Sequence, residues 1–268
     1  MLKYTHGDVK IKGINLHYYR TGGKKPPFIL LHGASDNGLC WAPVAELLAK
    51  QYDVIMPDAQ GHGLSDRIDR DFNEENHAHQ VAGLVQELGI SKPIIMGHSM
   101  GAGVTSVVAA KYPDLPRAII LEDIAWDGYK LLQTKQNSEV SRTLIERVSR
   151  TREELINECR QANPRWSEAE IIPWAEAKKQ FDPTILSVVT MGGTSYTQVV
   201  PFIKCPVFVI ISDGGIGSPE GVERAKKLYR SDQPFRWVQI KGAGHNIRRE
   251  QFKAFCEALF DFLQILPK

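Results

Sequence analysis

The segment that decides the fold spans residues 93–103 and has the sequence PIIMGHSMGAG. A short apolar run ends at Gly97, and a run of small residues compatible with a helix begins shortly after Ser99. The pattern predicts a strand, a tight corner and a helix, with Ser99 at the corner. A Gly-x-Ser-x-Gly pattern is typical of a strained turn that exposes a nucleophilic serine, and its glycines let the backbones crowd. Ser99 is therefore the candidate nucleophile, and the alternative is a turn serine without a chemical role.

The chain has the composition of an ordinary globular protein. Hydrophobic residues make up 43% and charged residues 24% of its 268 residues, and the formal net charge is +2. This small charge gives no reason to expect binding to nucleic acid or to an anionic membrane. The four cysteines are far apart without metal-ligand spacing, so we expect buried, reduced thiols, no metal site and a cytoplasmic location. We expect no secretory leader and no membrane span, because no apolar run is long enough.

Strands and helices are expected to alternate on both sides of the Ser99 corner. Residues 8–21 alternate between apolar and polar side chains around a Lys12-Gly13 turn, which predicts a β-hairpin. A continuous apolar run at residues 28–31 predicts a strand buried on both faces, and further strands are predicted at residues 53–58, 117–123, 206–212 and 235–240. Such alternation requires parallel strands with right-handed crossovers. The predicted class is α/β, with a mostly parallel central sheet flanked by helices.

The alternation is interrupted between residues 125 and 200. The sequence there is mostly charged and compatible with helices, and no buried strand is predicted. We expect residues 125–200 to form a helical cap (lid) over the strand ends, because an insertion of this kind is more often a cap than an independent domain. Residues 1–124 and 201–268 then form the core.

Local signals predict where several helices begin. Thr151 is followed three residues later by Glu154, and Ser167 is followed in the same way by Glu170, so each pair predicts a capping box. The last helix is predicted as one amphipathic helix over residues 246–266.

His245 is the preferred candidate for the base that a nucleophilic serine requires. It follows the last predicted strand in the glycine-rich loop 242–245, from which its side chain can reach over the carboxyl edge of the sheet. The alternative is an incidental loop histidine. His32, His62 and His98 are expected to brace loops or to be structural, because each lies beside a glycine turn or inside the corner itself.

The chain resembles the α/β-hydrolase fold superfamily in several motifs. The matching motifs follow the family's order: His32-Gly33 with Trp41, Pro57-Asp58 with residues 61–65, the Ser99 corner, and the loop ending at His245. These motifs indicate the fold but not a substrate. The resemblance implies an oxyanion hole made by the backbone N–H groups of Met100 and Ala34, with Gly33 as the less favoured second donor. It also implies that Asp58 braces loops.

The sequence leaves the third member of the triad open. Most relatives carry the acid in a Gly-x-x-Asp turn after the strand equivalent to 206–212, but residues 212–215 here are SDGG, with glycine at the aspartate position. A minority branch, including haloalkane dehalogenases and some lactone hydrolases, takes its acid from the end of the preceding core strand. Asp123 has that spacing from Ser99. The order of preference is Asp123, then Asp213, then Glu122; otherwise, Asp213 is a turn residue and the other two cap the chain's exit from the core.

The resemblance implies a serine hydrolase that cleaves a carboxylic ester or lactone of a small, apolar substrate through an acyl-enzyme. Ser99 would attack, His245 would transfer the proton and Asp123 would orient the imidazole. One alternative is a C–C bond hydrolase of the meta-cleavage-product type with the same triad, and another is a ligand receptor or idle relative. Epoxide hydrolases are disfavoured, because members of the similar family with that activity have an aspartate at the position of Ser99. No phosphate-binding loop or dinucleotide motif is present, so no cofactor is implied.

Aromatic residues of the expected cap are candidates to line an apolar substrate pocket. They are Trp126, Trp166, Trp174 and Tyr196, with Tyr129, Phe181 and Met191 as further candidates. The alternative is that they form the cap's own packing, since helical spacing suits either role. The expected partner is a small molecule, and the oligomeric state is left open.

Overall fold

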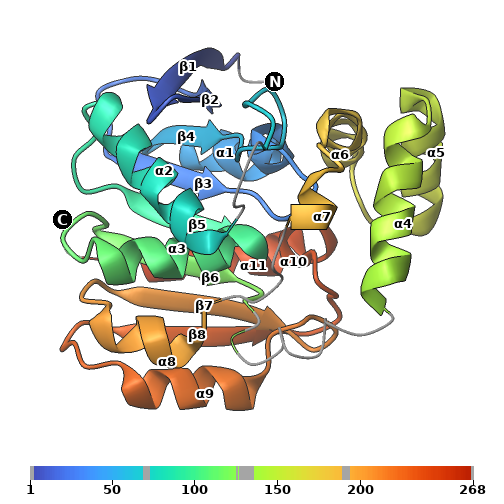
Figure 1. The fold of residues 1–268 in the computed structure, drawn as a ribbon. Helices are drawn as coiled ribbons and strands as arrows, with labels where there is room; N and C mark the ends of the chain where they lie inside the picture. The colour runs from blue at the N-terminus through green and yellow to red at the C-terminus, as the bar shows by residue number, and fades with distance from the viewer. Residues whose placement is uncertain (1–2, 69–72, 125, 127–135, 189–193, 267–268) are drawn as a thin grey trace.

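An eight-stranded sheet runs through the molecule, with helices on both faces (Figure 1). The structure is a computed structural model that describes residues 3–68, 73–124, 126, 136–188 and 194–266. The strands are β1 Thr5–Ile11, β2 Ile14–Arg20, β3 Pro27–Leu31, β4 Asp53–Pro57, β5 Ile94–His98, β6 Ala118–Glu122, β7 Val207–Ser212 and β8 Phe235–Ile240. Their order in the sheet is β1-β2-β4-β3-β5-β6-β7-β8. Pairing is antiparallel from β1 to β2 and from β2 to β4 and parallel elsewhere, which confirms the predicted class.

Helices connect most of these strands. Before the inserted region the structure has η1 Gly38–Trp41, α1 Ala42–Leu48, α2 Glu74–Glu87 and α3 Met100–Lys111. Between β6 and β7 it has α4 Gln136–Ser149, α5 Arg152–Ala162, α6 Glu168–Gln180, α7 Ile185–Val188, α8 Tyr196–Val199 and η3 Val200–Phe202. The remaining helices are α9 Pro219–Leu228, α10 Ile247–Glu250 and α11 Phe252–Gln264. In the described parts of the chain, no helix has the length and apolar character needed to cross a membrane.

Alternating side chains of the strands supply two hydrophobic clusters, one on each face of the sheet. In β3, Ile29 and Leu31 belong to one cluster, and Phe28 and Leu30 belong to the other. Helices α2, α3 and α9 cover the first face, and α1 and α11 cover the second (Figure 1). The continuous apolar runs in the sequence are therefore strands buried on both faces.

Helices α4 to α7 lie beyond the carboxyl ends of the parallel strands (Figure 1). Helices α5 and α6 share a small hydrophobic cluster that includes Leu155, Cys159, Ile171 and Trp174. The described part of 125–200 is helical, as the sequence predicts, and its role as a cap stays a prediction. Its position places it next to the loops where α/β proteins bind ligands.

Two helix ends differ from the prediction. The capping box at the start of α5 is present, but Ser167 at the start of α6 accepts no capping hydrogen bond. Its predicted partner Glu170 instead accepts a hydrogen bond from Arg249 Nε at 3.1 Å. The last helix is also broken into α10 and α11 at Gln251, whose φ of −132° and ψ of 52° are not helical. The hydrogen bond from Arg249 to Glu170 is a tertiary contact, which local signals in the sequence do not contain.

Candidate active site

Ser99 occupies a one-residue corner between β5 and α3. Its φ of 52° and ψ of −114° are a strained combination for a residue with a side chain. Its N–H donates to the Glu122 carbonyl at 3.0 Å, which ties the corner to β6. A Cβ on Gly97 would lie 2.1 Å from the Gly101 carbonyl oxygen, and one on Gly101 would lie 2.3 Å from the Leu31 carbonyl oxygen. Crowding of backbones therefore requires both glycines, as the sequence pattern predicts.

A chain of hydrogen bonds links Ser99, His245 and Asp123. Ser99 Oγ lies 2.9 Å from His245 Nε2, and His245 Nδ1 lies 2.6 Å from Asp123 Oδ2. The carboxylate accepts the proton of Nδ1, which leaves Nε2 free to accept the serine proton. The side chain of His245 is 36% exposed, whereas that of Asp123 is 0% exposed. The structure therefore brings the three favoured triad candidates together from the ends of β5, β8 and β6.

The loop after β7 surrounds the Asp123 carboxylate. The Ile216 N–H donates to Oδ2 at 2.9 Å, and the Gly217 N–H donates to Oδ1 at 3.0 Å. A Cβ on Gly215 would lie 2.4 Å from Asp123 Oδ2. The glycine at the family's usual aspartate position thus leaves the space that the Asp123 carboxylate fills. Sequence analysis missed the two N–H donors, although the glycine-rich SDGG turn signals an unusual backbone there.

The two other acid candidates lie apart from the imidazole and have other partners. Asp213 is exposed, and its Oδ1 accepts the Gly242 N–H at 2.8 Å, so it braces the loop 242–245 that carries His245, here called the base loop. Glu122 is fully buried and accepts hydrogen bonds from the Arg248 N–H and from Arg248 Nη1, each at 3.0 Å. Burial raises the pKa of the Glu122 carboxyl, against the opposing effect of the Arg248 charge. Glu122 therefore pairs with Arg248 and does not cap the chain's exit from the core, which was the alternative hypothesis for it.

The backbone around His245 is held by buried side chains. His98 Nε2 lies 2.9 Å from the His245 carbonyl oxygen, and the two rings lie 4.7 Å apart between centroids. Burial, followed by the nearby Arg248 charge, holds the pKa of His98 well below its usual range, so the neutral ring donates from Nε2. Ser212 Oγ donates to the Gly244 carbonyl at 2.8 Å. These contacts fix the base loop against β5 and β7, and they leave His98 bonded to backbone rather than to Ser99.

The predicted oxyanion donors lie on either side of Ser99. Met100 is the first residue of α3, where a backbone N–H has no acceptor within the helix. Ala34 follows β3 and is exposed, and its neighbour Gly33 borders the corner, because a Cβ on Gly33 would lie 3.5 Å from Ser99 Cβ. These positions suit an oxyanion hole, and the roles of Met100, Ala34 and Gly33 stay predictions.

Three further motif residues brace the loops around the corner, as the sequence predicts. His32 Nε2 accepts the Ala59 N–H at 3.0 Å, and His62 Nε2 accepts the Ser35 N–H at 3.1 Å. Asp58 accepts two backbone N–H groups, that of Gly38 on Oδ1 at 2.7 Å and that of Leu64 on Oδ2 at 2.8 Å. Burial lowers the pKa of both histidines, so their rings can accept these bonds while neutral. They position loops rather than reacting groups.

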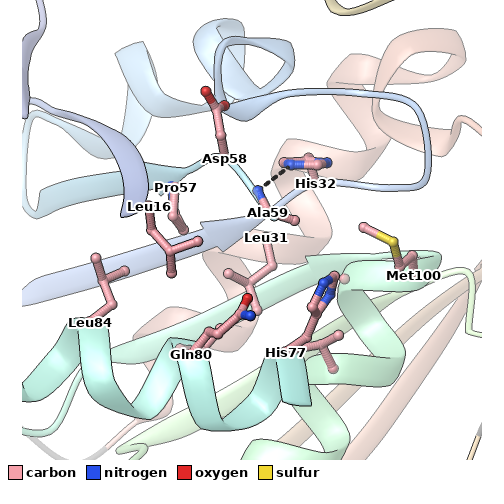
Figure 2. Close-up of a pocket in the computed structure, with 13 residues that line it drawn as sticks. Leu16, Leu31, His32, Pro57, Asp58, Ala59, His77, Gln80, Leu84 and Met100 are labelled. Carbon is pink, nitrogen blue, oxygen red and sulfur yellow. Dashed lines mark hydrogen bonds between the residues drawn. The ribbon is translucent and has the colours of Figure 1, made fainter. Parts of the chain in front are cut away.

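A small, mostly apolar cavity of about 30 Å³ lies beside Met100, between α2 and the ends of β3 and β4. Figure 2 shows Met100 at one end of this cavity, with His77 and Gln80 facing it from α2. Ser99 and His245 do not line it, and none of the predicted pocket residues does.

The predicted pocket residues make packing contacts, and their place in a substrate pocket stays a prediction. The Arg249 guanidinium lies over the Trp166 ring at 4.7 Å, and Lys178 Nζ lies over the Trp174 ring at 4.9 Å. Trp126, Tyr196 and Phe181 pack in hydrophobic clusters, whereas Tyr129 and Met191 lie outside the described residues. Helical spacing produces the same apolar stripe for packing as for a pocket, which is why the sequence leaves both roles open.

A buried ion network lies behind the loop 33–37, and sequence analysis missed it. Asp36 Oδ1 lies 3.1 Å from Lys178 Nζ, and Asp36 Oδ2 lies 2.9 Å from Arg249 Nη2. Burial opposes the charge of Asp36, but Arg249 and Lys178 together hold the pKa of its carboxyl well below its usual range. Lysine and arginine are seldom buried, so charged residues on a helix such as α6 are expected to face solvent. The sequence therefore gave no signal that Lys178 and Arg249 meet Asp36 in the interior.

The described residues were expected to hold no metal site, and their cysteines to be reduced. No group of three or more His, Cys, Asp or Glu residues among the described positions is arranged to hold a metal ion. The four cysteines are buried free thiols, as the sequence predicts.

The chain is similar in sequence and in fold to known proteins. A family model described as alpha/beta hydrolase fold matches residues 26–248. The N-formylmaleamate deformylase of Pseudomonas putida is 26% identical over 263 residues, which cover 96% of each chain. The 2-(acetamidomethylene)succinate hydrolase of Mesorhizobium japonicum is 35% identical over 104 residues, or 39% of this chain and 37% of that one. Among solved structures, an N-formylmaleamic acid deformylase from Pseudomonas putida has a TM-score of 0.79, with 23% identity, 96% of this chain and 100% of that chain covered.

Proposed function

The chain belongs to the alpha/beta hydrolase fold family, and on this premise we propose that it is a serine hydrolase that cleaves an acyl bond. The observation that carries the proposal is the continuous relay from Ser99 Oγ through the His245 imidazole to the buried Asp123 carboxylate. A serine hydroxyl becomes a useful nucleophile when a neutral imidazole accepts its proton and a carboxylate holds that imidazole in the right tautomer.

The proposed reaction begins when Ser99 Oγ attacks the acyl carbon and its proton passes to His245 Nε2. The new imidazolium is stabilised by Asp123, whose own charge is held by the two N–H donors of the loop after β7. The oxyanion of the tetrahedral intermediate accepts hydrogen bonds from the N–H groups of Met100 and Ala34. His245 then protonates the leaving group, and water repeats the sequence on the acyl-enzyme to release the acid and restore Ser99.

The acyl bond could be an ester or lactone, as the sequence resemblance implies, or an amide. The relay serves each, because the difference lies in which atom of the leaving group accepts the proton from His245. The amide alternative is favoured by the deformylase of Pseudomonas putida, which aligns over 96% of this chain. The substrate of the proposed enzyme is a small molecule in either case, and the reaction uses water as the only second reactant.

Two other reactions known for this fold differ in how far the residues at the site separate them from acyl hydrolysis. A C–C bond hydrolase would use the same three residues, so only a substrate test separates it from an acyl hydrolase. Epoxide hydrolases of this fold have an aspartate as the nucleophile at the corner, whereas this chain has Ser99 there. Ser99 is therefore the residue on which the first experiment turns.

The experiment measures hydrolysis of p-nitrophenyl esters of increasing acyl length, lactones, N-formyl and N-acetyl amides, and a ring-cleavage dienone. Ser99→Ala should abolish turnover of whichever class is cleaved, and a fluorophosphonate should label the native protein at Ser99. Ser106→Ala is the matched control, because its hydroxyl bonds the Gly103 carbonyl on the same helix and lies outside the relay. Unimpaired turnover by Ser99→Ala, or labelling at another residue, would contradict the serine mechanism.

A further inference from the structure

Lys178 is a buried lysine on α6 whose ammonium group binds the loop after β3. Its Nζ donates to the Ser35 carbonyl oxygen at 2.7 Å and to Ser35 Oγ at 3.0 Å, and it lies 3.1 Å from Asp36 Oδ1. The side chain is only 4% exposed. Burying an ammonium group is costly unless it is paired and hydrogen-bonded, so this geometry is strongly specified by its partners.

The residue that Lys178 holds is strained. Ser35 has a φ of 59°, in the left-handed region that residues with a side chain rarely adopt. Its N–H donates to His62 Nε2 at 3.1 Å, while its carbonyl accepts from Lys178. Both peptide groups of Ser35 are therefore held by buried side chains. The Ala34 N–H belongs to the peptide before the N-terminal one of these, and the Gly33 carbonyl of that peptide accepts the Asp36 N–H at 3.2 Å. The turn held at Ser35 and Asp36 therefore also fixes the peptide plane that carries the Ala34 N–H.

We propose that Lys178 is a positioning residue, which holds Ser35 so that the Ala34 N–H faces the oxyanion. The inference rests on the proposed function, because this N–H matters only if Ser99 forms a tetrahedral intermediate. A preorganised donor stabilises the developing charge without having to reorient during the reaction. In this proposal, α6 contributes to the geometry of the catalytic centre through Lys178.

The ion network predicts that the protein folds without this lysine. Asp36 keeps Arg249 Nη2 at 2.9 Å and Arg248 Nη2 at 3.7 Å, so its charge stays paired in Lys178→Met. Methionine also has a flexible side chain that fills irregular space in a core. The neighbouring Lys179 supplies a matched control, because its Nζ donates to the carbonyls of Val148 and Arg150 within the inserted helices.

The experiment compares wild type, Lys178→Met, Lys179→Met and Ser99→Ala on one activated ester, with urea unfolding of each. Phenylboronic acid, which forms a tetrahedral adduct with a catalytic serine, probes the oxyanion site directly. We expect Lys178→Met to lower kcat by about 10-fold to 100-fold with KM within about twofold, since a whole oxyanion donor contributes about 10²-fold to 10³-fold. The Kd of phenylboronic acid should rise by a similar factor. Lys179→Met should change each value by less than about threefold.

The possible outcomes separate the two proposals. Loss of turnover in Ser99→Ala with equal kcat in the two lysine variants would overturn the role of Lys178 alone. A raised KM with unchanged kcat would do the same, because Lys178 would then act on binding. Turnover that survives Ser99→Ala would overturn the proposed function and this inference with it. If Lys178→Met fails to fold, Lys178→Gln takes its place, and failure of both to fold would assign Lys178 to global stability and overturn the proposal.

Discussion

The loops after β6 and β7 are neighbours at the carboxyl edge of the sheet, because the two strands pair in parallel, but they contribute different chemistry. The first loop presents the carboxylate of Asp123 to His245. The second presents backbone N–H groups of Ile216 and Gly217 to that carboxylate, and Gly215 leaves the space for it. A single acid site is thus assembled from two loops, one of which supplies the charge and the other its hydrogen-bond donors.

Two adjacent carboxylates at the end of β6 have different partners. Glu122 is the last residue of the strand and binds the buried Arg248, whereas Asp123 follows it with a left-handed φ of 49° and binds the His245 imidazole. The direction of a side chain, rather than its distance along the chain, therefore decides which carboxylate can serve the base. Four predictions test this division of roles.

The largest expected effect belongs to Asp123→Asn. The amide cannot stabilise the imidazolium or hold the tautomer with Nδ1 protonated, and the equivalent change in a serine protease lowers kcat by about 10⁴. We expect a loss of that order with an unchanged circular dichroism spectrum. Asp213→Asn is the control from the second loop and should lose less than about tenfold, or roughly 1.4 kcal/mol of barrier. A crippled Asp213→Asn beside an active Asp123→Asn would reverse the roles of the loops.

Moving the acid from one loop to the other should restore part of this loss. In Asp123→Gly the glycine accommodates the left-handed φ of 49° at that position and vacates the space beside residue 215. Adding Gly215→Asp places a carboxylate at the family's usual position. We expect the double variant to recover at least about tenfold in kcat over Asp123→Gly, a gain of about 1.4 kcal/mol. No recovery in a folded double variant would mean that the second loop cannot present an acid to His245.

A smaller effect is expected from Gly215→Ala. The added Cβ would meet Asp123 Oδ2 at 2.4 Å, so the carboxylate must shift away from its position against His245. We expect kcat to fall by about tenfold. The fall should nearly vanish in the Asp123→Asn background, because the effects of substitutions at two residues in contact are not additive. Equal losses in both backgrounds would show that Gly215 acts through the loop itself and not through the acid.

The smallest effect on kcat, less than about tenfold, is expected for Glu122→Gln. Its test is stability against pH. The folded pKa of Glu122 is raised by burial, so its contribution to stability is full below the unfolded pKa of about 4.3 and is lost as pH rises through the folded value. The free energy of unfolding of wild type relative to Glu122→Gln, measured in urea titrations, should therefore fall as the pH rises above about 4.3. A relative stability that rises instead would mean that pairing with Arg248 outweighs burial.

Local information in the sequence was sufficient for the sheet, the Ser99 corner and the position of His245. Apolar runs of strand length and the glycines that flank Ser99 report backbone geometry directly, because burial on both faces and backbone crowding each restrict the residue types allowed. The position of His245 follows from the order of strands, since the loops after parallel strands gather at one edge.

Other features depend on which segments meet in space. The N–H donors on Asp123, the pairing of Glu122 with Arg248, and the hold of Lys178 on Ser35 each join residues far apart in the chain. The aromatic residues expected in a pocket were equally ambiguous, because a helix shows the same apolar stripe whether it packs or lines a cavity. Hydrogen bonds and ion pairs require contact within a few ångströms, and only the packing of strands and inserted helices in the tertiary structure decides which of the many charged residues come that close.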